Sequence, residues 1–143
     1  MIQVISYPAL PQEAKYIRET VFVKEQHFNV EFDEIDEIAT HLVLFVDDAP
    51  AACCRLFPDE QPDCYIVGRI AVLKAYRGRH LGERMLAEAE DAILAKSGKK
   101  VSLSAQLRVK AFYEKQGYIP SGAVYLDEYC EHIHMEKQLL AAE

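Results

Sequence analysis

The sequence predicts a single α/β or α+β domain with a mixed central β-sheet flanked by helices. The chain has 143 residues, half of them hydrophobic, which suits one globular domain and is too short for two. Apolar residues alternate in some segments and recur every three or four positions in others, so strands and helices are interleaved. Such interleaving is typical of a sheet with helices packed on it. We therefore treat residues 1–143 as one domain.

The first half of the chain is predicted to hold one helix and three strands. Pro11 lies in the first helical turn, and Ala14, Ile17 and Val21 recur on one helix face. Residues 31–37 carry five acidic side chains and are expected to form a solvated surface loop. Two apolar runs on either side of the turn DDAP predict an antiparallel hairpin, and CYIVGRIAVL predicts a third strand.

The second half is predicted to alternate helix, strand, helix and strand. Apolar residues recur every four positions from Leu81 to Ile93, and Gly98 is expected to close this amphipathic helix. KKVSLSA alternates as a strand, QLRVKAFYEKQGY predicts a short helix that stops at Gly117, and EHIHMEKQL predicts the last strand. A further short strand at each end completes the expected order.

Composition limits the possible partners and the compartment. The net charge of -7 and the pI near 5.2 disfavour a broad nucleic-acid surface, which needs clustered Lys and Arg. No apolar run approaches the roughly 20 residues that span a bilayer, so no membrane partner is expected. The four cysteines form neither a CxxC pair nor a disulfide framework. We expect a soluble, cytoplasmic protein without a metal site.

Despite the acidic balance, one segment concentrates positive charge. Residues 74–84 hold four Lys or Arg against the single acid Glu83. A strand that ends near Val72 and a helix that begins near His80 would direct unpaired backbone N–H groups and the positive end of the helix dipole at one spot. This arrangement predicts a phosphate or pyrophosphate site. The alternative is a purely structural turn, with Gly78 and Gly82 serving conformation and packing.

The same segment resembles a known family motif. VGRIAVLKAYRGRHLGERML is similar to the acyl-CoA-binding motif of the GNAT superfamily of N-acetyltransferases, whose pattern is Gln/Arg, two residues, Gly, one residue, Gly/Ala. Arg77 matches the first position and Gly82 the last, whereas His80 replaces the first glycine. IRETVFVKEQ, HLVLF, LSAQ, AFYEKQGY and HIHMEK follow the order of a bacterial subgroup similar to the ElaA and YjcF proteins. The resemblance covers Ile17 to Lys137.

This resemblance implies a fold, an activity and a set of residues. Two neighbouring parallel strands, around Ile70 and Val101, would diverge to form the acyl-CoA cleft. The implied activity is transfer of the acetyl group of acetyl-CoA to a primary amine by direct attack in a ternary complex. Tyr113 would protonate the leaving thiolate, and Gln106 would contact the pantetheine. The other implied cofactor-binding residues are Ile70, Ala71 and Val72 for pantetheine, through their backbone, and Arg77, Gly78, Arg79, His80, Leu81 and Gly82 for pyrophosphate.

Several assignments stay open at the level of sequence. No general base is assigned, and the candidates are Glu25, Glu31, Asp36, His41 and His134. Arg55 and Arg69 interrupt apolar strands, so they either bind an acidic group of the substrate or pair with acids of residues 31–37. Cys53 and Cys54 are expected to pack in the core rather than to carry an acetyl group.

Two other functions compete with the enzyme. One is a non-catalytic acyl-CoA-binding or regulatory module, and the other is an unrelated phosphate-binding domain. The expected acceptor is a small-molecule or peptide amine, and the acidic residues 31–37 favour a cationic one. A homodimer is possible by analogy with the family.

Overall fold

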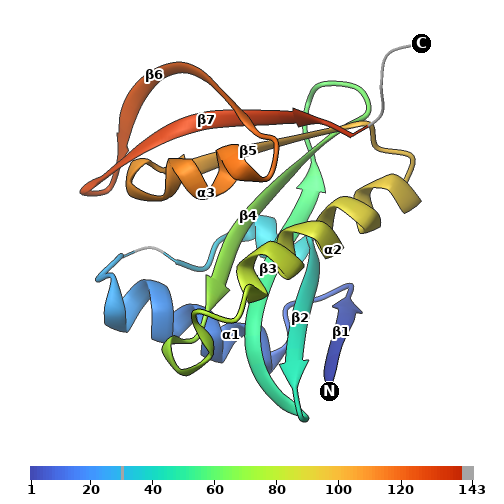
Figure 1. Cartoon of the computed structure of the whole chain (residues 1–143), viewed down its shortest axis with the longest axis vertical. Helices are drawn as coiled ribbons and strands as arrows, with labels where there is room; N and C mark the ends of the chain where they lie inside the picture. Colours follow the sequence, from blue (N-terminus) through green and yellow to red (C-terminus); the bar gives the residue numbers. More distant parts are fainter. Residues whose placement is uncertain (30, 140–143) are drawn as a thin grey trace.

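A seven-stranded mixed sheet organises the chain, and it confirms the predicted α+β class. The computed structural model describes residues 1–29 and 31–139. The strand order is β1-β2-β3-β4-β5-β7-β6, and every neighbouring pair is antiparallel except β4 and β5 (Figure 1). The strands are β1 (Ile2–Tyr7), β2 (Thr40–Val46), β3 (Ala49–Pro58), β4 (Cys64–Val72), β5 (Lys100–Gln106), β6 (Ile119–Asp127) and β7 (Cys130–Gln138).

Helices cover both faces of the sheet. They are α1 (Gln12–Arg18), η1 (Glu19–Glu25), η2 (Glu34–Glu37), η3 (Lys74–Tyr76), α2 (Leu81–Ala95), η4 (Leu107–Val109) and α3 (Lys110–Lys115). One buried cluster packs α1 and η1 against Val43, Cys53 and Ala71. The other packs α2 against the opposite side chains of β2 to β5 and β7, with Phe112 and Tyr113 of α3 at its margin. We call these two sides the α1 face and the α2 face.

The terminal strands differ in part from the expectation. The β2–β3 hairpin is antiparallel as predicted, and its turn places Asp47 and Asp48 at φ values of 48° and 71°, which suits a two-residue turn. The short strand expected at the N-terminal end is β1. The expected short strand at the C-terminal end is wrong in place and length, because β6 has nine residues and precedes β7. Residues 140–143 lie outside the described residues.

The first predicted helix has two backbone forms. α1 ends at Arg18 and continues as the π-helix η1, in which the Gln26 N–H donates to the Val21 carbonyl at 3.0 Å. Side-chain periodicity alone does not distinguish a wider turn from an α-helix. π-Helical turns are frequent at functional sites, and η1 lies directly beside the cleft described below.

The end of α2 shows a different use of glycine from the one predicted. Ser97, and not Gly98, takes the left-handed conformation, with φ of 68°. A Cβ at Gly98 would lie 2.4 Å from Cγ2 of Ile93, so this glycine permits close packing. α2 has fifteen residues, and among the described residues no helix combines the length and apolar character needed to cross a membrane.

The parallel pair β4–β5 diverges, as predicted. Only Cys64–Ile66 of β4 pairs with Lys100–Ser102 of β5. From Leu103 onward, β7 is the one described strand that pairs with β5 (Figure 1). On its other edge β4 pairs with β3 up to Val72, with a register shift beside Arg69, whose φ is 54°. The divergence opens the middle of the sheet.

Candidate active site

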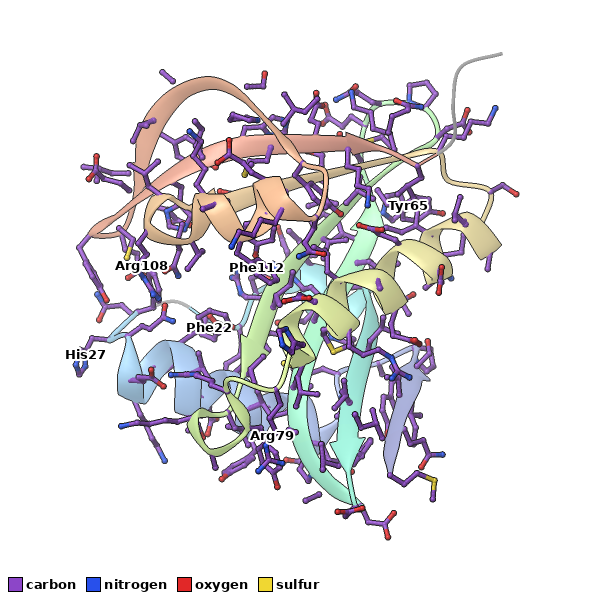
Figure 2. The ribbon with its side chains drawn as sticks, in the orientation of Figure 1. Phe22, His27, Tyr65, Arg79, Arg108 and Phe112 are labelled. Carbon is purple, nitrogen blue, oxygen red and sulfur yellow. The ribbon has the colours of Figure 1, made fainter. Side chains whose placement is uncertain are left out.

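A cleft of about 790 Å³ lies where β4 and β5 separate. Phe22 of η1 and Phe112 of α3, both labelled in Figure 2, line it, so the cleft is bordered by elements of both faces. All three predicted pantetheine-contacting residues, Ile70, Ala71 and Val72, line it. Because the β4 edge turned toward β5 has no described strand partner here, its backbone groups can pair with an extended amide-bearing ligand.

The start of α2 provides donors for an anion. The first backbone hydrogen bond of the helix comes from the Arg84 N–H, and His80 at the N-cap makes no side-chain cap. The N–H groups of Leu81 and Gly82 therefore have no helical partner. Gly82 also lines the cleft, and a Cβ there would lie 3.4 Å from Cζ of Phe112. These features fit a pyrophosphate group at the helix N-terminus.

The two arginines predicted to bind pyrophosphate, Arg77 and Arg79, make different contacts. Arg77 lines the cleft, but its guanidinium donates to Glu25 at 2.7 and 2.8 Å and to the Val72 carbonyl at 3.0 Å. Arg79 lies over the Tyr76 ring at 5.5 Å. Backbone N–H groups, rather than an unpaired arginine at position 77, are thus the readiest donors.

Two residues of the turn before α2, Gly78 and His80, have positive φ values. Gly78 has φ of 82°, so glycine suits this position. His80 has φ of 60°, a backbone conformation that favours glycine, and its exposed ring contacts Glu83 at 3.0 Å. The imidazole therefore points to a surface carboxylate in this structure.

Two further predicted residues, Gln106 and Tyr113, line the cleft. The Gln106 amide donates to Gln26 Oε1 at 2.9 Å and accepts from Arg108 Nε at 3.0 Å, which links β5 to the end of η1. Tyr113 packs edge-on against Phe112 and Tyr118. Burial raises the pKa of Tyr113 to about 12, so its phenol stays protonated at neutral pH.

Of the five candidate bases, only Glu25 and Glu31 line the cleft. Glu25 is paired with Arg77, whose hydrogen bonds lower the pKa of that carboxyl. Glu31 is 5% exposed and paired with Arg18 at 2.7 Å and Arg69 at 3.0 Å. The remaining candidates contact other groups: Asp36 binds Arg18 and Arg55, His41 contacts the Asp36 carbonyl, and His134 contacts Ser102 and Glu136.

His132 is a cleft residue that the sequence analysis did not select. It lies on β7 opposite Gln106 and is 6% exposed. The alternation in EHIHMEK placed it on one strand face with His134, but that pattern does not say which histidine lies nearer the point where the sheet opens.

Three of the five acidic residues in 31–37 belong to an ion-pair network, so the expectation of a solvated loop is wrong for them and holds only for the exposed Glu34 and Glu37. Glu31, Asp33 and Asp36 meet Arg18, Arg55 and Arg69, one from each of three elements. Asp36 is 6% exposed and receives bonds from Arg18 at 2.7 Å and Arg55 at 2.9 Å. A buried arginine needs such partners, which is why acids gather in this segment.

The network shows which partners Arg55 and Arg69 have, a choice that the sequence left open between the substrate and the acids of residues 31–37. Arg55 pairs with Asp33 at 2.6 Å and with Asp36, as one alternative proposed. Arg69 pairs with Glu31 and Asp33 and also lines the cleft. Three arginines compensate these three acids, so attraction of a cationic acceptor would depend on the exposed Glu34 and Glu37.

We expect this network to set the acid limit of the fold. Burial opposes ionisation of Asp36, but hydrogen bonds from Arg18 and Arg55 prevail and lower its pKa from 3.8 to about 2. Between these pKa values the unfolded chain binds more protons than the folded protein. The contribution of Asp36 to the free energy of unfolding is therefore fully present above about pH 5 and falls progressively toward pH 2. Burial raises the pKa of Glu31, which acts in the opposite direction. Urea unfolding between pH 7 and 3 measures this slope.

The variant Asp36→Asn should have a flatter stability–pH curve than the wild type. Since asparagine does not titrate, the contribution from position 36 is removed while the shape is kept. Equal slopes for the two proteins below pH 5 would contradict the assignment of the acid limit to Asp36.

Cys53 and Cys54 pack in the core, as expected. Both side chains are buried on β3, where their successive positions place them in the α1-face and α2-face clusters respectively. Burial raises the pKa of Cys53 to about 12 and raises that of Cys54 as well. A thiol held neutral in this way is a poor nucleophile.

Comparisons with known proteins agree with this architecture. A family model described as an acetyltransferase (GNAT) domain matches residues 8–139. The uncharacterized N-acetyltransferase YjcF of Bacillus subtilis is 32% identical over 130 residues, which cover 88% of this chain and 91% of YjcF. The crystal structure of Escherichia coli ElaA has a TM-score of 0.86 at 25% identity, covering 96% of this chain and all of that one.

An acyl-CoA N-acyltransferase from Pseudomonas aeruginosa is similarly related in structure. Its TM-score is 0.85 at 25% identity, with 96% of this chain and 99% of that chain covered. The family model and the similarity to YjcF extend over most of the sequence, including both strands that diverge and the start of α2. The chain therefore belongs to the GNAT acetyltransferase family.

Proposed function

We propose that this protein is an N-acetyltransferase that moves the acetyl group of acetyl-CoA to a primary amine by direct attack in a ternary complex. The observation that carries the proposal is the cleft at the β4–β5 divergence, which joins the uncapped start of α2 and Tyr113 to an opening on the α1 face. A single cleft that borders both faces can hold two substrates at once.

Each part of acetyl-CoA has a suitable group in the chain. Backbone groups of Ile70, Ala71 and Val72 would pair with the pantetheine amides, and Gln106 lies within the same cleft. The N–H groups of Leu81 and Gly82 would hold the pyrophosphate, with Arg79 near the same turn. When bound, acetyl-CoA supplies an activated thioester, and the protein orients it.

Tyr113 is the group we assign as general acid. Its phenol lines the cleft from the α2 face and stays protonated because burial raises its pKa to about 12. A thiolate released beside the buried Tyr113 phenol would likewise be more basic than in water, which favours transfer of the proton to sulfur. Cys53 and Cys54 have no comparable access, so we propose no acetyl-cysteine step.

A non-catalytic acyl-CoA-binding module remains the second candidate. Its support is the state of the five acids and histidines proposed from sequence: the two in the cleft are ion-paired, and the other three do not line it. Turnover of any amine by the wild type distinguishes the enzyme from the module.

Tyr113→Phe should lower kcat by about 100-fold and leave acetyl-CoA affinity within about twofold, because the ring stays and only the hydroxyl that donates the proton is lost. Calorimetry measures the affinity, and release of free thiol in the presence of an amine panel measures turnover. The matched control is Tyr118→Phe, whose ring contacts Tyr113 but does not line the cleft. Unchanged kcat in Tyr113→Phe would contradict the assignment.

The acceptor and assembly state belong to the same proposal. A small-molecule or peptide amine is the proposed acceptor, and a homodimer stays a prediction by family analogy. A cytoplasmic location stays a prediction from the cysteine pattern. Sedimentation of the purified chain measures the assembly state directly.

A further inference from the structure

One imidazole lines the cleft from the side opposite Tyr113. His132 lies directly across the β5–β7 ladder from Gln106, so the two side chains lie side by side on one face. Gln106 is hydrogen-bonded to Gln26 at the end of η1, which identifies this as the α1 face. Tyr113 belongs to α3 and packs with the α2-face cluster. The two side chains thus border one cleft from opposite faces of the sheet.

The hydrogen bonding of His132 defines its tautomer. Its Nδ1 lies 3.0 Å from the Cys130 carbonyl oxygen, which can only accept, so Nδ1 carries the proton and donates. Nε2 then holds the lone pair. The Tyr125 ring stacks on the imidazole, with centroids 6.0 Å apart and an interplanar angle of 25°, and holds its orientation.

Nε2 is accessible from the cleft. No described side chain or backbone group is hydrogen-bonded to it. Among the described residues, the one side-chain nitrogen or oxygen that is both buried and without a partner is Arg55 Nε. Nε2 therefore reaches open space, and the open space beside this largely buried residue is the cleft.

We propose that His132 is the general base that removes the proton from the acceptor amine. The inference rests on the proposed acetyltransferase function and assigns the catalytic group that the sequence left open. The placement of His132 and Tyr113 on opposite faces suits this reaction, because an entering amine and a leaving thiolate lie on different sides of the acetyl carbon. A base on the α1 face and an acid on the α2 face serve these two positions.

The proton balance closes with these two residues. Nε2 of His132 takes one proton from the ammonium form of the acceptor, and the neutral nitrogen forms the N–C bond as the C–S bond breaks. The C–S electron pair goes to sulfur, which takes the Tyr113 phenolic proton. His132 releases the first proton to solvent, takes the second proton from nitrogen as the amide forms and releases it as well, while the tyrosinate regains a proton from solvent. One proton ends on the thiol and one in water.

Three of the carboxylates that line the cleft are held by arginines and are therefore less suited to this task. Glu25 and Glu31 are held by arginines, and Asp33 is held by Arg55. Glu128 accepts from the Asn29 N–H at 2.8 Å. The titratable and charged groups that line the cleft together with His132, and so influence its protonation, are Glu25, Glu31, Asp33, Arg69, Arg77, Arg108, Tyr113, Asp127 and Glu128, with Tyr125 stacked on its ring.

The kinetic test replaces His132 with glutamine. We expect kcat/KM for the amine to fall by about 100-fold at pH 7, with acetyl-CoA affinity within about twofold of the wild type. The kcat/KM of His132→Gln should rise tenfold per pH unit with the fraction of neutral amine, whereas the wild-type enzyme should depend on pH less steeply because its base removes the proton from the bound ammonium. The matched control is His134→Gln, on the same strand and outside the cleft lining.

A kcat/KM of His132→Gln within threefold of the wild type, or an unchanged pH profile, would overturn the role of His132 while the acetyltransferase function stands. Wild-type protein that binds acetyl-CoA but acetylates no amine would overturn the proposed function and this inference with it. Free imidazole should partly restore His132→Ala if the missing group is a base.

A readout in the free protein is independent of turnover. NMR of the histidine ring carbons and nitrogens, assigned by the loss of signals in His132→Gln, should show the Nδ1–H tautomer of the neutral ring. The opposite tautomer would contradict the proposal.

Discussion

Replacing Gly82 with glutamate should weaken acetyl-CoA binding by about 1000-fold. The residue is in the first turn of α2, where the backbone N–H groups are free and where the cleft begins. A carboxylate about 4 Å from a bound phosphate costs about 4 kcal/mol at the effective dielectric of a protein surface, which is roughly a thousandfold in Kd. Calorimetric titration of wild type and variant measures the loss.

Two control variants separate bulk from charge. Gly82→Ala adds a Cβ at 3.4 Å from Phe112 Cζ, which small movements accommodate, so its affinity should stay within about tenfold of the wild type. Gly82→Gln has the bulk of glutamate without its charge and should bind more tightly than Gly82→Glu. Equal affinity of Gln and Glu variants would show that no anion sits at this helix start. Absence of wild-type binding would mean that the basic turn serves another anion.

Replacing Arg18 with methionine should destabilise the protein by about 3–5 kcal/mol. Arg18 is 1% exposed and donates to Glu31 Oε2 at 2.7 Å, to the Glu31 carbonyl at 3.0 Å and to both Asp36 oxygens. Methionine has a similar length but leaves two buried carboxylates short of a partner, and breaking a buried pair from one side has costs of this size. Urea unfolding at pH 7 gives the difference.

The surface pair Arg84–Glu88 provides the control. Both side chains are substantially exposed, so Arg84→Met should change stability by less than about 0.5 kcal/mol. Arg18→Met should also disturb the cleft, because Arg18 holds Glu31, which in turn holds Arg69. A loss below about 1 kcal/mol for Arg18→Met would show that the network stabilises the fold much less than its burial suggests.

Local sequence patterns predicted most of the elements correctly, and for a physical reason. The four-residue repeat from Leu81 to Ile93 faces one core cluster, and the alternation in β5 and β7 separates core from surface. These patterns depend on neighbours along the chain. The π-helical turns of η1 escaped prediction because a widened helix keeps nearly the same apolar spacing over two turns. β6 escaped because most of its side chains are exposed, so it carries no alternation.

The features of the candidate site likewise separate into those that depend on neighbours along the chain and those that depend on distant contacts. The sequence by itself determined the fold class and the family resemblance, and it predicts the place of the anion site, because a basic turn, a helix start and its glycines are adjacent in the chain. Only the tertiary structure decided that Glu25, 52 residues before Arg77, pairs with it. It also decided that Glu31, Asp33 and Asp36 pair with three arginines, and that His132 rather than His134 lines the cleft. Each of these depends on contacts between distant segments, which the spacing of residues along one segment does not specify.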